Sequence, residues 1–266
     1  MKKYYFLVSL PRSGNTLLGS ILNQNKKISV TANSIVPEIL WQLNMIKNTS
    51  LLFKNFPDEK SYSNIINKVF ELYYKDWNSE IIIDRSRWGS DANIDLLNKY
   101  CPNKPKFIIL VRPIEEVLAS FIKWSEENPH NFINSESSVK TIEGKCDFLM
   151  SPELQIVQEY SSIYNIMKKY TSNDYILITY DNLINNTENE IGKIYDFINL
   201  EKYNHRFSNI DEFSANGCIY NDLVVGNNLH KVYKNIKKNK YSINKYLPKH
   251  VIEKYSNLNF WQECNK

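Results

Sequence analysis

The chain has 266 residues, of which 42% are hydrophobic, and this is enough for the core of one α/β domain but short for two independent domains. Its net charge of +4 is too small for a duplex-DNA-binding protein, which usually has a concentrated basic face, and suits a small anionic ligand better. No stretch approaches the roughly 18 to 20 apolar residues of a membrane span. We therefore expect a single cytoplasmic domain, residues 1–266, that binds no nucleic acid and has no membrane span.

The cysteines do not form a metal-binding pattern. They are widely separated, and they lack the CxxC pairs and neighbouring histidines that are typical of structural zinc sites. We therefore expect reduced thiols and no bound metal. The four residues are Cys101, Cys146, Cys218 and Cys264.

The chain is predicted to begin with a strand, a tight loop and a helix. Residues 4–10 are a run of bulky β-type side chains, which ends where Pro11 and Gly14 break the pattern. Apolar residues then recur at helical spacing in the segment 17–22. A short strand at residues 28–30 is expected to follow.

The second half of the chain contains the less regular segments. Residues 125–150 are polar and lose periodicity, which predicts a loop or lid. Helical signals follow at 151–170 and 186–199, on either side of a strand at 175–180. The tail, residues 205–266, is rich in Lys, Asn and Tyr and is expected to pack on the domain, with a helical piece near 249–257.

Two central strands carry continuous apolar runs. Residues 80–84 and 106–111 read as strands covered on both faces, as in a parallel sheet. Helices are predicted at 37–45, 61–77 and 114–124. The alternation predicts a P-loop-like, three-layer α/β/α domain with a central, mostly parallel sheet and helical insertions. Its ligand crevice would lie at the carboxyl ends of the strands.

Arginine is rare in this chain and is concentrated at predicted strand ends. Only five of the 33 basic residues are arginines, so lysine is the default surface cation. The planar guanidinium group pairs bidentately with phosphate or sulfate, whereas lysine acts as a point charge. Ion pairing with a nearby carboxylate would explain any single arginine, but it explains less well the convergence of three strand ends. The arginines at these ends are Arg12, Arg85, Arg87 and Arg112.

The segment from Ser9 to Thr16 has the features of a phosphate-binding loop. The chain leaves a buried strand, turns at Gly14 and starts a helix, so that free backbone N–H groups point to one place that favours an anion. The Walker pattern is nearly present, but Ser9 replaces its first glycine and Asn15 replaces its lysine. A nucleoside triphosphate would therefore lack its main counter-charge. An ordinary strand-to-helix turn is the alternative interpretation of this loop.

Two segments together resemble the sulfotransferases that depend on 3′-phosphoadenosine 5′-phosphosulfate (PAPS). PRSGNTLL, residues 11–18, is similar to the 5′-phosphosulfate loop of that family. VRPIEEVLASFIKW, residues 111–124, is similar to its 3′-phosphate motif, an arginine followed by a serine eight positions on. The likeness is closer to the bacterial and tyrosylprotein-sulfotransferase-like branch than to the steroid and phenol branch, and it covers residues 4 to about 200 in element order.

The resemblance implies an enzyme that moves a sulfuryl group from PAPS to a hydroxyl or amine acceptor by in-line transfer, without a metal. It would release adenosine 3′,5′-bisphosphate (PAP). Arg12 and Arg85 would be catalytic, with Arg85 at the position where the family usually has a lysine. Arg112 and Ser120 would hold the 3′-phosphate, and Tyr180 would lie near the adenine. The 5′-phosphosulfate would be held by Arg12, Ser13, Gly14, Asn15, Thr16 and Leu17.

The residue that removes the acceptor's proton is not where the resemblance implies. Relatives use a glutamate just past the second strand or a histidine after the third, and here the first place reads TANS, residues 31–34. Asp84 is the candidate that we assign as catalytic, and Glu38 is a second. Asp84 could instead pair with Arg87, and Glu38 could be a solvated helix residue. His230 is more typical of a surface or capping residue.

Two other functions stay open on the sequence alone. A P-loop kinase would require Mg²⁺, and a catalytically silent module would bind PAPS or PAP without turnover. The acceptor could be a small molecule, a glycan or a peptide. Trp88 and Trp124 either line an acceptor pocket or belong to the core. The lysines between Lys231 and Lys238 either approach the phosphates or form a solvated face.

Overall fold

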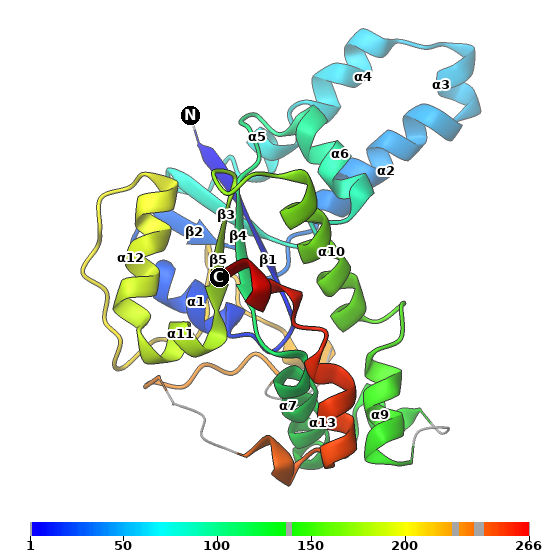
Figure 1. Ribbon diagram of the computed structural model, residues 1–266. Coiled ribbons are helices and arrows are strands. Elements are labelled where there is room, and N and C mark those ends of the chain that lie inside the picture. The colour runs from blue at the N-terminus through cyan, green and yellow to red at the C-terminus, as the bar shows by residue number, and fades with distance from the viewer. Residues whose placement is uncertain (1, 137–139, 225–228, 237–241, 266) are drawn as a thin grey trace.

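Figure 1 shows the computed structural model of the chain, which describes residues 2–136, 140–224, 229–236 and 242–265. Within these residues, five strands form one sheet in the order β2-β3-β1-β4-β5, and every neighbouring pair is parallel. The predicted parallel sheet is confirmed. The strands are β1 (Lys3–Ser9), β2 (Ile28–Val30), β3 (Ile81–Arg85), β4 (Phe107–Val111) and β5 (Tyr175–Thr179).

The sheet separates two apolar cores, one against each face. Phe6 and Val8 of β1 belong to one core and Leu7 belongs to the other, because successive side chains point to opposite faces. All three are buried, which explains why the strands read as continuous apolar runs. The fold is therefore the expected three-layer α/β/α arrangement. One core includes residues of α2 (Val36–Thr49), α5 (Val69–Tyr73), α6 (Asp91–Tyr100), α7 (Ile114–Glu127), α10 (Gln155–Lys169) and α13 (Lys249–Ser256), and the other includes residues of α1 (Asn15–Leu22), α11 (Tyr180–Asn185) and α12 (Thr187–Ile198).

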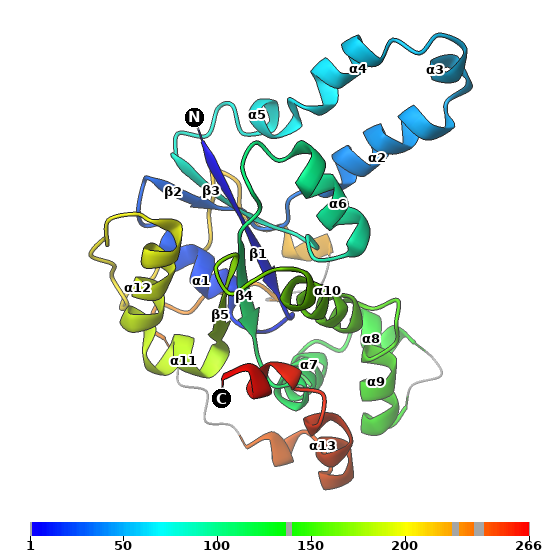
Figure 2. The ribbon, with the colours of Figure 1, turned by 45° about the horizontal axis from the view of Figure 1, so that its top comes forward.

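A helical projection stands out from the sheet beyond α2 (Figures 1 and 2). It continues through α3 (Leu51–Asn55) and α4 (Glu59–Ile66) before α5 returns to the core. The sequence predicts one helix over 61–77, and this is wrong because the chain leaves the helical conformation at Lys68, with φ −103° and ψ 2°. Asn67 just before it is a weak helix former, because its side chain competes for backbone hydrogen bonds.

Five helices of the described chain are missing from the prediction, and α3 and α11 are two of them. Helix α6 begins after Ser90, whose hydroxyl accepts a hydrogen bond from a backbone N–H of the first turn. Helices α8 (Phe132–Ser135) and α9 (Ile142–Leu149) lie in the segment 125–150, which is predicted to be a loop. Each is held by a capping side chain, and each is too short for an apolar period to be recognised.

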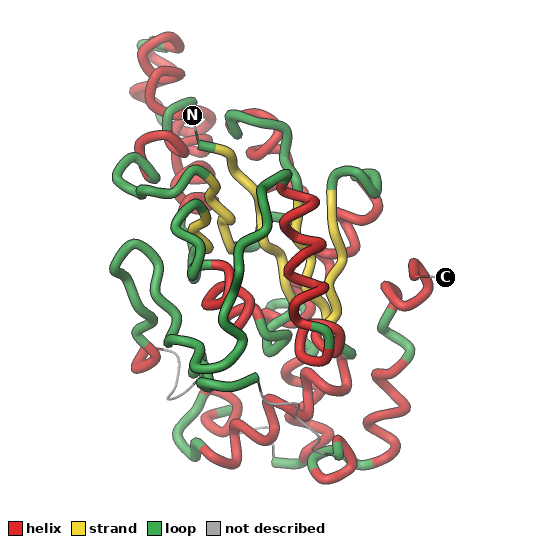
Figure 3. Tube along the Cα trace, turned by 90° about the vertical axis from the view of Figure 1, so that its left-hand side faces the viewer, coloured by secondary structure: helices red, strands yellow, loops and turns green. Residues whose placement is uncertain are grey.

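The tail beyond residue 205 contributes to both cores. Ile210 and Phe213 pack with α1 and α12, whereas Val251 and Trp261 pack with α7 and α10. Figure 3 shows the sheet from the side of α12, with long loop segments running beside the strands. None of the helices that the structure describes is both long and apolar enough to cross a membrane. The tail also contains short 3₁₀ helices at Asp222–Val224, Ile243–Lys245 and Phe260–Asn265.

Gly89 lies where the chain after β3 approaches α10 most closely. A Cβ atom at this position would lie 2.3 Å from the carbonyl oxygen of Ser162. Backbone meets backbone here, so no flexible side chain can move to make room. The missing side chain of Gly89 therefore sets the distance between the end of β3 and α10.

We expect the substitution Gly89→Ala to lower the free energy of unfolding by about 1 to 3 kcal/mol, the usual cost of overpacking. Urea denaturation of the wild type and the variant measures this difference. Gly192→Ala on α12 is the matched control, because its Cβ would meet only the flexible Lys202, at 3.6 Å, and alanine favours a helix. Equal stability of the wild type and Gly89→Ala would show that the contact is not tight.

Candidate functional site

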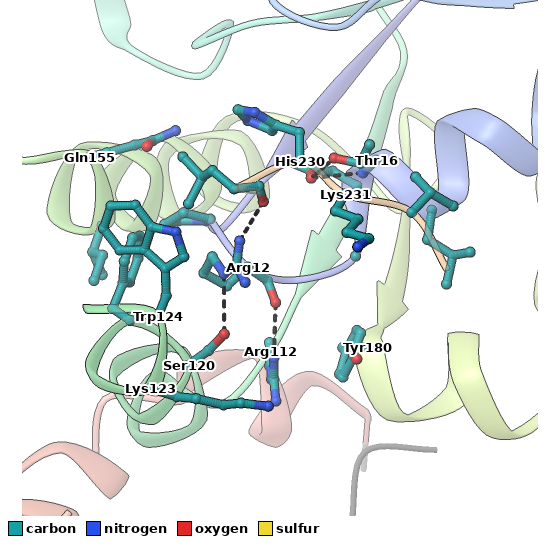
Figure 4. Close-up of a pocket in the computed structure, with 18 of the residues that line it drawn as sticks. Arg12, Thr16, Arg112, Ser120, Lys123, Trp124, Gln155, Tyr180, His230 and Lys231 are labelled. Atoms are coloured by element: carbon teal, nitrogen blue, oxygen red, sulfur yellow. Dashed lines mark hydrogen bonds between the residues drawn. The ribbon is translucent and has the colours of Figure 1, made fainter. Parts of the chain in front are cut away.

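The carboxyl ends of β1, β3 and β4 open into a cavity of about 750 Å³. The β1–α1 loop, the end of β3, α7, α11 and the tail form its wall (Figure 4). Its volume lies within the roughly 300 to 1,000 Å³ that small-molecule pockets usually have. The cavity therefore lies at the edge of the sheet where the sequence places the ligand crevice.

Two left-handed backbone positions shape the loop between β1 and α1. Arg12 has φ 61° and Gly14 has φ 88°, and Gly14 is also the N-cap of α1. A Cβ at Gly14 would lie 3.0 Å from the ring of Tyr180, so both the backbone and the contact with α11 require glycine. A loop of this kind before a helix start directs N–H groups to one point, which favours an anion.

Asn15 occupies the place where a Walker loop has lysine, and its side chain is bound to the loop itself. The amide nitrogen donates to Ser9 Oγ at 3.1 Å, and Asn15 Oδ1 accepts a hydrogen bond from the backbone N–H of Thr16 at 2.8 Å. Asn15 therefore stabilises the loop and brings no positive charge to the cavity.

The guanidinium group of Arg12 connects the loop to two distant segments. Its Nε donates to Ser120 Oγ on α7 at 3.1 Å, and its Nη1 donates to the carbonyl oxygen of Leu229 in the tail at 2.5 Å. Figure 4 shows this side chain between the loop and α7. Arg12 thus lies at the centre of the wall rather than at its rim.

Arg112 is buried, with only 4% of its surface exposed, and the three contacts described next hold its side chain. It donates from Nη1 to the carbonyl oxygen of Arg12 at 3.0 Å and from Nε to Glu116 Oε2 at 3.0 Å. Its guanidinium carbon lies 4.3 Å from the centre of the Tyr180 ring. The ring and the loop therefore fix the plane of the guanidinium group, as bidentate anion recognition requires.

Most of the residues that the sequence places in the site line this one cavity. Ser13 and Asp84 do not. Ser13 is fully buried, and within the described residues its hydroxyl has no hydrogen-bond partner. The described part of the chain has no group of three or more His, Cys, Asp or Glu side chains that could hold a metal ion. The predicted residues that line the cavity are Arg12, Gly14, Asn15, Thr16, Leu17, Arg85, Arg112, Ser120 and Tyr180.

Asp84 is a buried residue whose carboxylate is occupied by hydrogen bonds. It accepts hydrogen bonds from Ser34 Oγ at 2.8 Å, from Trp88 Nε1 at 2.8 Å and from the hydroxyl of Tyr74. The alternative pairing with Arg87 is wrong, because Arg87 donates to Gln158 instead. Burial raises the pKa of Asp84 to about 6. These contacts favour a structural role beneath the cavity over the role of a base within it.

Arg85 lies between the first cavity and a second one. The second cavity, of about 540 Å³, shares Arg85, Arg87 and Gln155 with the first. The Arg85 side chain donates to the carbonyl oxygen of Ala32 at 2.8 Å and also to the side chain of Asn33. The TANS segment after β2 therefore positions Arg85, although it lacks the glutamate that the resemblance implies.

Glu159 is a site residue that the sequence interpretation misses. It lines the second cavity and is only 4% exposed. A signal is present in the sequence, because Glu159 lies on the buried face of α10 between Ile156 and Ile163. A carboxylate at a core position of an amphipathic helix is unusual unless it is paired.

His230 also lines the first cavity, although its sequence context is typical of a surface residue. Its Nδ1 lies 2.6 Å from Asp222 Oδ1, and its ring stacks on Tyr220 at 3.8 Å between centroids. Burial lowers the pKa of His230, and the charges of Arg85 and Arg12 act in the same direction. The imidazole is therefore expected to be neutral at pH 7, and no motif in the tail signals it.

The tryptophans and lysines for which the sequence leaves alternatives open differ in where they lie. Trp88 is fully buried and packs against Phe6 and Phe70, so it belongs to the core. Trp124 is buried as well, but it lines the first cavity. Lys231 also lines this cavity, whereas Lys237 and Lys238 lie outside the described residues.

Comparisons with known proteins identify relatives of the chain. The model of the sulfotransferase family matches residues 5–205. No curated protein matches the chain. Similar solved structures include the mouse sulfotransferase SULT7A1 complexed with PAP, which is 14% identical with a TM-score of 0.60 over 97% of this chain and 83% of that one.

Two further structures have the same fold. A retinol dehydratase in complex with androsterone and the inactive cofactor PAP is 13% identical with a TM-score of 0.53, over 96% of this chain and 79% of that one. The sulfotransferase domain from the curacin biosynthetic pathway is 15% identical with a TM-score of 0.52, over 76% of each chain. At these identities the structures show a common fold.

We expect Asp84→Ala to destabilise the protein strongly, because it removes the acceptor of three buried donors, each of which costs about 1 to 3 kcal/mol when left unpaired. Asp95→Ala on the exposed side of α6 is the control. In thermal denaturation, the melting temperature should fall strongly for Asp84→Ala and should stay near that of the wild type for Asp95→Ala.

The difference in stability between the wild type and Asp84→Ala should depend on pH, because the pKa of Asp84 is raised in the folded chain. The folded chain holds the proton up to about pH 6, whereas the unfolded chain releases it near pH 4. The wild type therefore loses stability as the pH rises through this window, and Asp84→Ala does not. The difference in melting temperature should narrow from pH 4 to pH 7, and a difference that widens would contradict the assignment.

Proposed function

Since this chain belongs to the sulfotransferase family, we propose that it transfers a sulfuryl group from PAPS to a hydroxyl or amine acceptor and releases PAP. The observation that carries the proposal is the connected set of Arg12, Arg112, Ser120 and Tyr180 at the wall of one cavity. These residues come from the loop after β1, the end of β4, α7 and α11. Their assembly at one place fits a ligand that has two anionic ends and a planar base.

The two anionic ends of PAPS would have different partners. The left-handed loop at Arg12 and Gly14 fits the 5′-phosphosulfate, because a helix start and its preceding turn favour an anion. Arg112 and Ser120 fit the 3′-phosphate. Tyr180, which stacks on Arg112, offers a ring for the adenine. The cavity of about 750 Å³ is large enough for a nucleotide of this size.

Sulfuryl transfer requires alignment of the acceptor oxygen, the sulfur and the leaving oxygen, with neutralisation of the charge that develops on the leaving group. Arg12 would stabilise the leaving 5′-phosphate. Arg85 lies where the two cavities meet, so it can contact the sulfuryl group during transfer. Removal of one preorganised donor of this type costs about 2.7 to 4 kcal/mol in oxyanion holes, and we expect a similar loss for Arg85.

The kinase alternative gains no support from the site. A P-loop kinase needs a cation at the position of Asn15, and this side chain binds Ser9 and the backbone of its own loop. The silent binding module makes the same contacts with the nucleotide as the enzyme does. Only a measurement of turnover, not of binding, therefore distinguishes the sulfotransferase from the silent binding module.

PAP should raise the melting temperature of the wild type in magnesium-free buffer by several degrees, and ATP should not match this increase. At a concentration 100 times its Kd, a ligand stabilises the folded state by about 2.7 kcal/mol. Arg112→Lys keeps the charge but loses the planar fork, so it should weaken PAP binding about tenfold or more. Arg206→Lys is the matched control, because Arg206 is an exposed arginine away from the cavity.

Absence of a PAP-dependent shift in the wild type would overturn the nucleotide assignment. Equal weakening by Arg112→Lys and Arg206→Lys would show that the effect does not come from the planar fork of Arg112 at the site. A shift without sulfuryl transfer to any hydroxyl or amine in an acceptor screen would favour the silent module.

A further inference from the structure

The second cavity adjoins the nucleotide cavity on the far side of Arg85. It has a volume of about 540 Å³ and shares Arg85, Arg87 and Gln155 with the first. It is lined on its outer side by the start of α2, including Ile35, Pro37, Glu38 and Trp41. A group that leaves the first cavity past Arg85 would therefore enter a space with an apolar wall.

Glu159 is the unusual group in this second cavity. Its side chain comes from the buried face of α10 and is only 4% exposed. Within the described residues, its Oε2 atom has no hydrogen-bond partner. Burial of a carboxylate without a hydrogen-bond partner costs free energy. A proton or a bound ligand that donates a hydrogen bond would reduce this cost.

We propose that the second cavity holds the acceptor and that Glu159 is the general base that removes its proton. This inference rests on the proposed sulfotransferase activity and assigns the base that the sequence lacks at its expected place. Ile35, Pro37 and Trp41 line part of this cavity, and most of its other lining residues are polar, so we expect the acceptor to be a hydroxyl group carried on an aromatic body, such as a phenol.

Transfer of the sulfuryl group to the acceptor hydroxyl conserves atoms and charge. The acceptor oxygen forms a bond to sulfur as the bond between sulfur and the bridging oxygen breaks. The proton of the acceptor hydroxyl passes to the Glu159 carboxylate, and the electron pair of the broken bond stays on the 5′-phosphate of PAP. Arg85 lines both cavities, so its guanidinium group can stabilise the negative charge on the sulfuryl group that moves between the two oxygens.

The charges around Glu159 suit a base that works near neutral pH. Burial raises its pKa from 4.5 to about 7, and the positive charges of Arg85 and Arg87 oppose this increase. Glu38 is the other acidic residue of the cavity. A base whose pKa lies near the working pH combines a useful ionised fraction with a good affinity for the proton.

Alternative bases fit the geometry less well. Asp84 lines neither cavity, and its oxygens already accept three hydrogen bonds. His230 lines the first cavity only, on the nucleotide side of Arg85. Glu38 lines the second cavity but belongs to the exposed side of α2. Glu159 alone among these combines burial, an oxygen without a hydrogen-bond partner in the described residues and a position in the cavity beyond Arg85.

The test compares Glu159→Gln with the matched control Glu188→Gln, an exposed glutamate of α12 that lines neither cavity, in a transfer assay from labelled PAPS. Two phenols serve as probes, the weakly acidic 2-naphthol and the more acidic 4-nitrophenol. Glu159→Gln should lower kcat for 2-naphthol by about 10² to 10⁴, the usual contribution of a general base, and should lower it much less for 4-nitrophenol, which needs less help to lose its proton. Glu188→Gln should change both rates less than threefold.

Binding and pH profiles separate this inference from the proposed function. Glu159→Gln should keep the PAP-dependent thermal shift of the wild type, and its kcat should lose the rise through pH 7 that the wild type has. If PAP does not stabilise the wild type, the proposed function fails first. If PAP binds but the wild type sulfates neither phenol, the assigned acceptor class is overturned.

The base assignment itself has two contrary outcomes. Equal losses with 2-naphthol and 4-nitrophenol would give Glu159 a positioning role instead of a proton-transfer role. If kcat of His230→Gln no longer rises through pH 7, and kcat of Glu159→Gln still does, then His230 is the base instead. Glu159→Gln keeps the size and shape of the side chain, so its folding can be checked by its melting temperature.

Discussion

The site depends on one hydrogen bond, from the guanidinium group of Arg112 to the carbonyl oxygen of Arg12 at 3.0 Å. It joins the loops that follow β1 and β4, which are neighbours in the sheet. Because the carbonyl belongs to a residue with φ 61°, the bond also stabilises the left-handed conformation from which the rest of the loop follows. The Tyr180 ring completes the arrangement, since it packs against both Arg112 and Gly14. One contact thereby fixes the relative positions of the two proposed anion sites.

The tail becomes part of the site through the same group of residues. Arg12 donates to the carbonyl oxygen of Leu229, and the next residue, His230, lines the cavity. Phe213 anchors the earlier part of the tail to the core beside α1. A segment without periodicity can thus be held in place by a few apolar anchors and one arginine. This accounts for the use of arginine here in a chain that otherwise prefers lysine.

The sequence predicts the sheet well, and most of the residues that it assigns to the site line one cavity, because both depend on local patterns. The strands follow from continuous apolar runs, and the anion loop follows from Gly14 and Arg12 between a strand and a helix. Short capped helices such as α8 and α9 have too few residues for a period. Helix α10 starts at Gln155 instead of Ser151, because Pro152 lies in a turn that the backbone N–H of Leu154 closes. Contacts between distant segments, such as that between His230 and Asp222, leave no local pattern.

The two buried carboxyl groups near the end of β3 show why a structure is needed to assign roles. Asp84 directly precedes Arg85, so sequence proximity favours it as the base, yet Ser34, Tyr74 and Trp88 satisfy its oxygens. Glu159 is 75 residues further along the chain, and the close approach of α10 at Gly89 brings it to the same strand end. Burial raises the pKa of both groups, so titration alone does not distinguish them. What distinguishes them is hydrogen bonding. The fold supplies three donors to Asp84, whereas Glu159 lines a cavity and its Oε2 atom has no hydrogen-bond partner within the described residues, so Glu159 is the one that can serve a ligand.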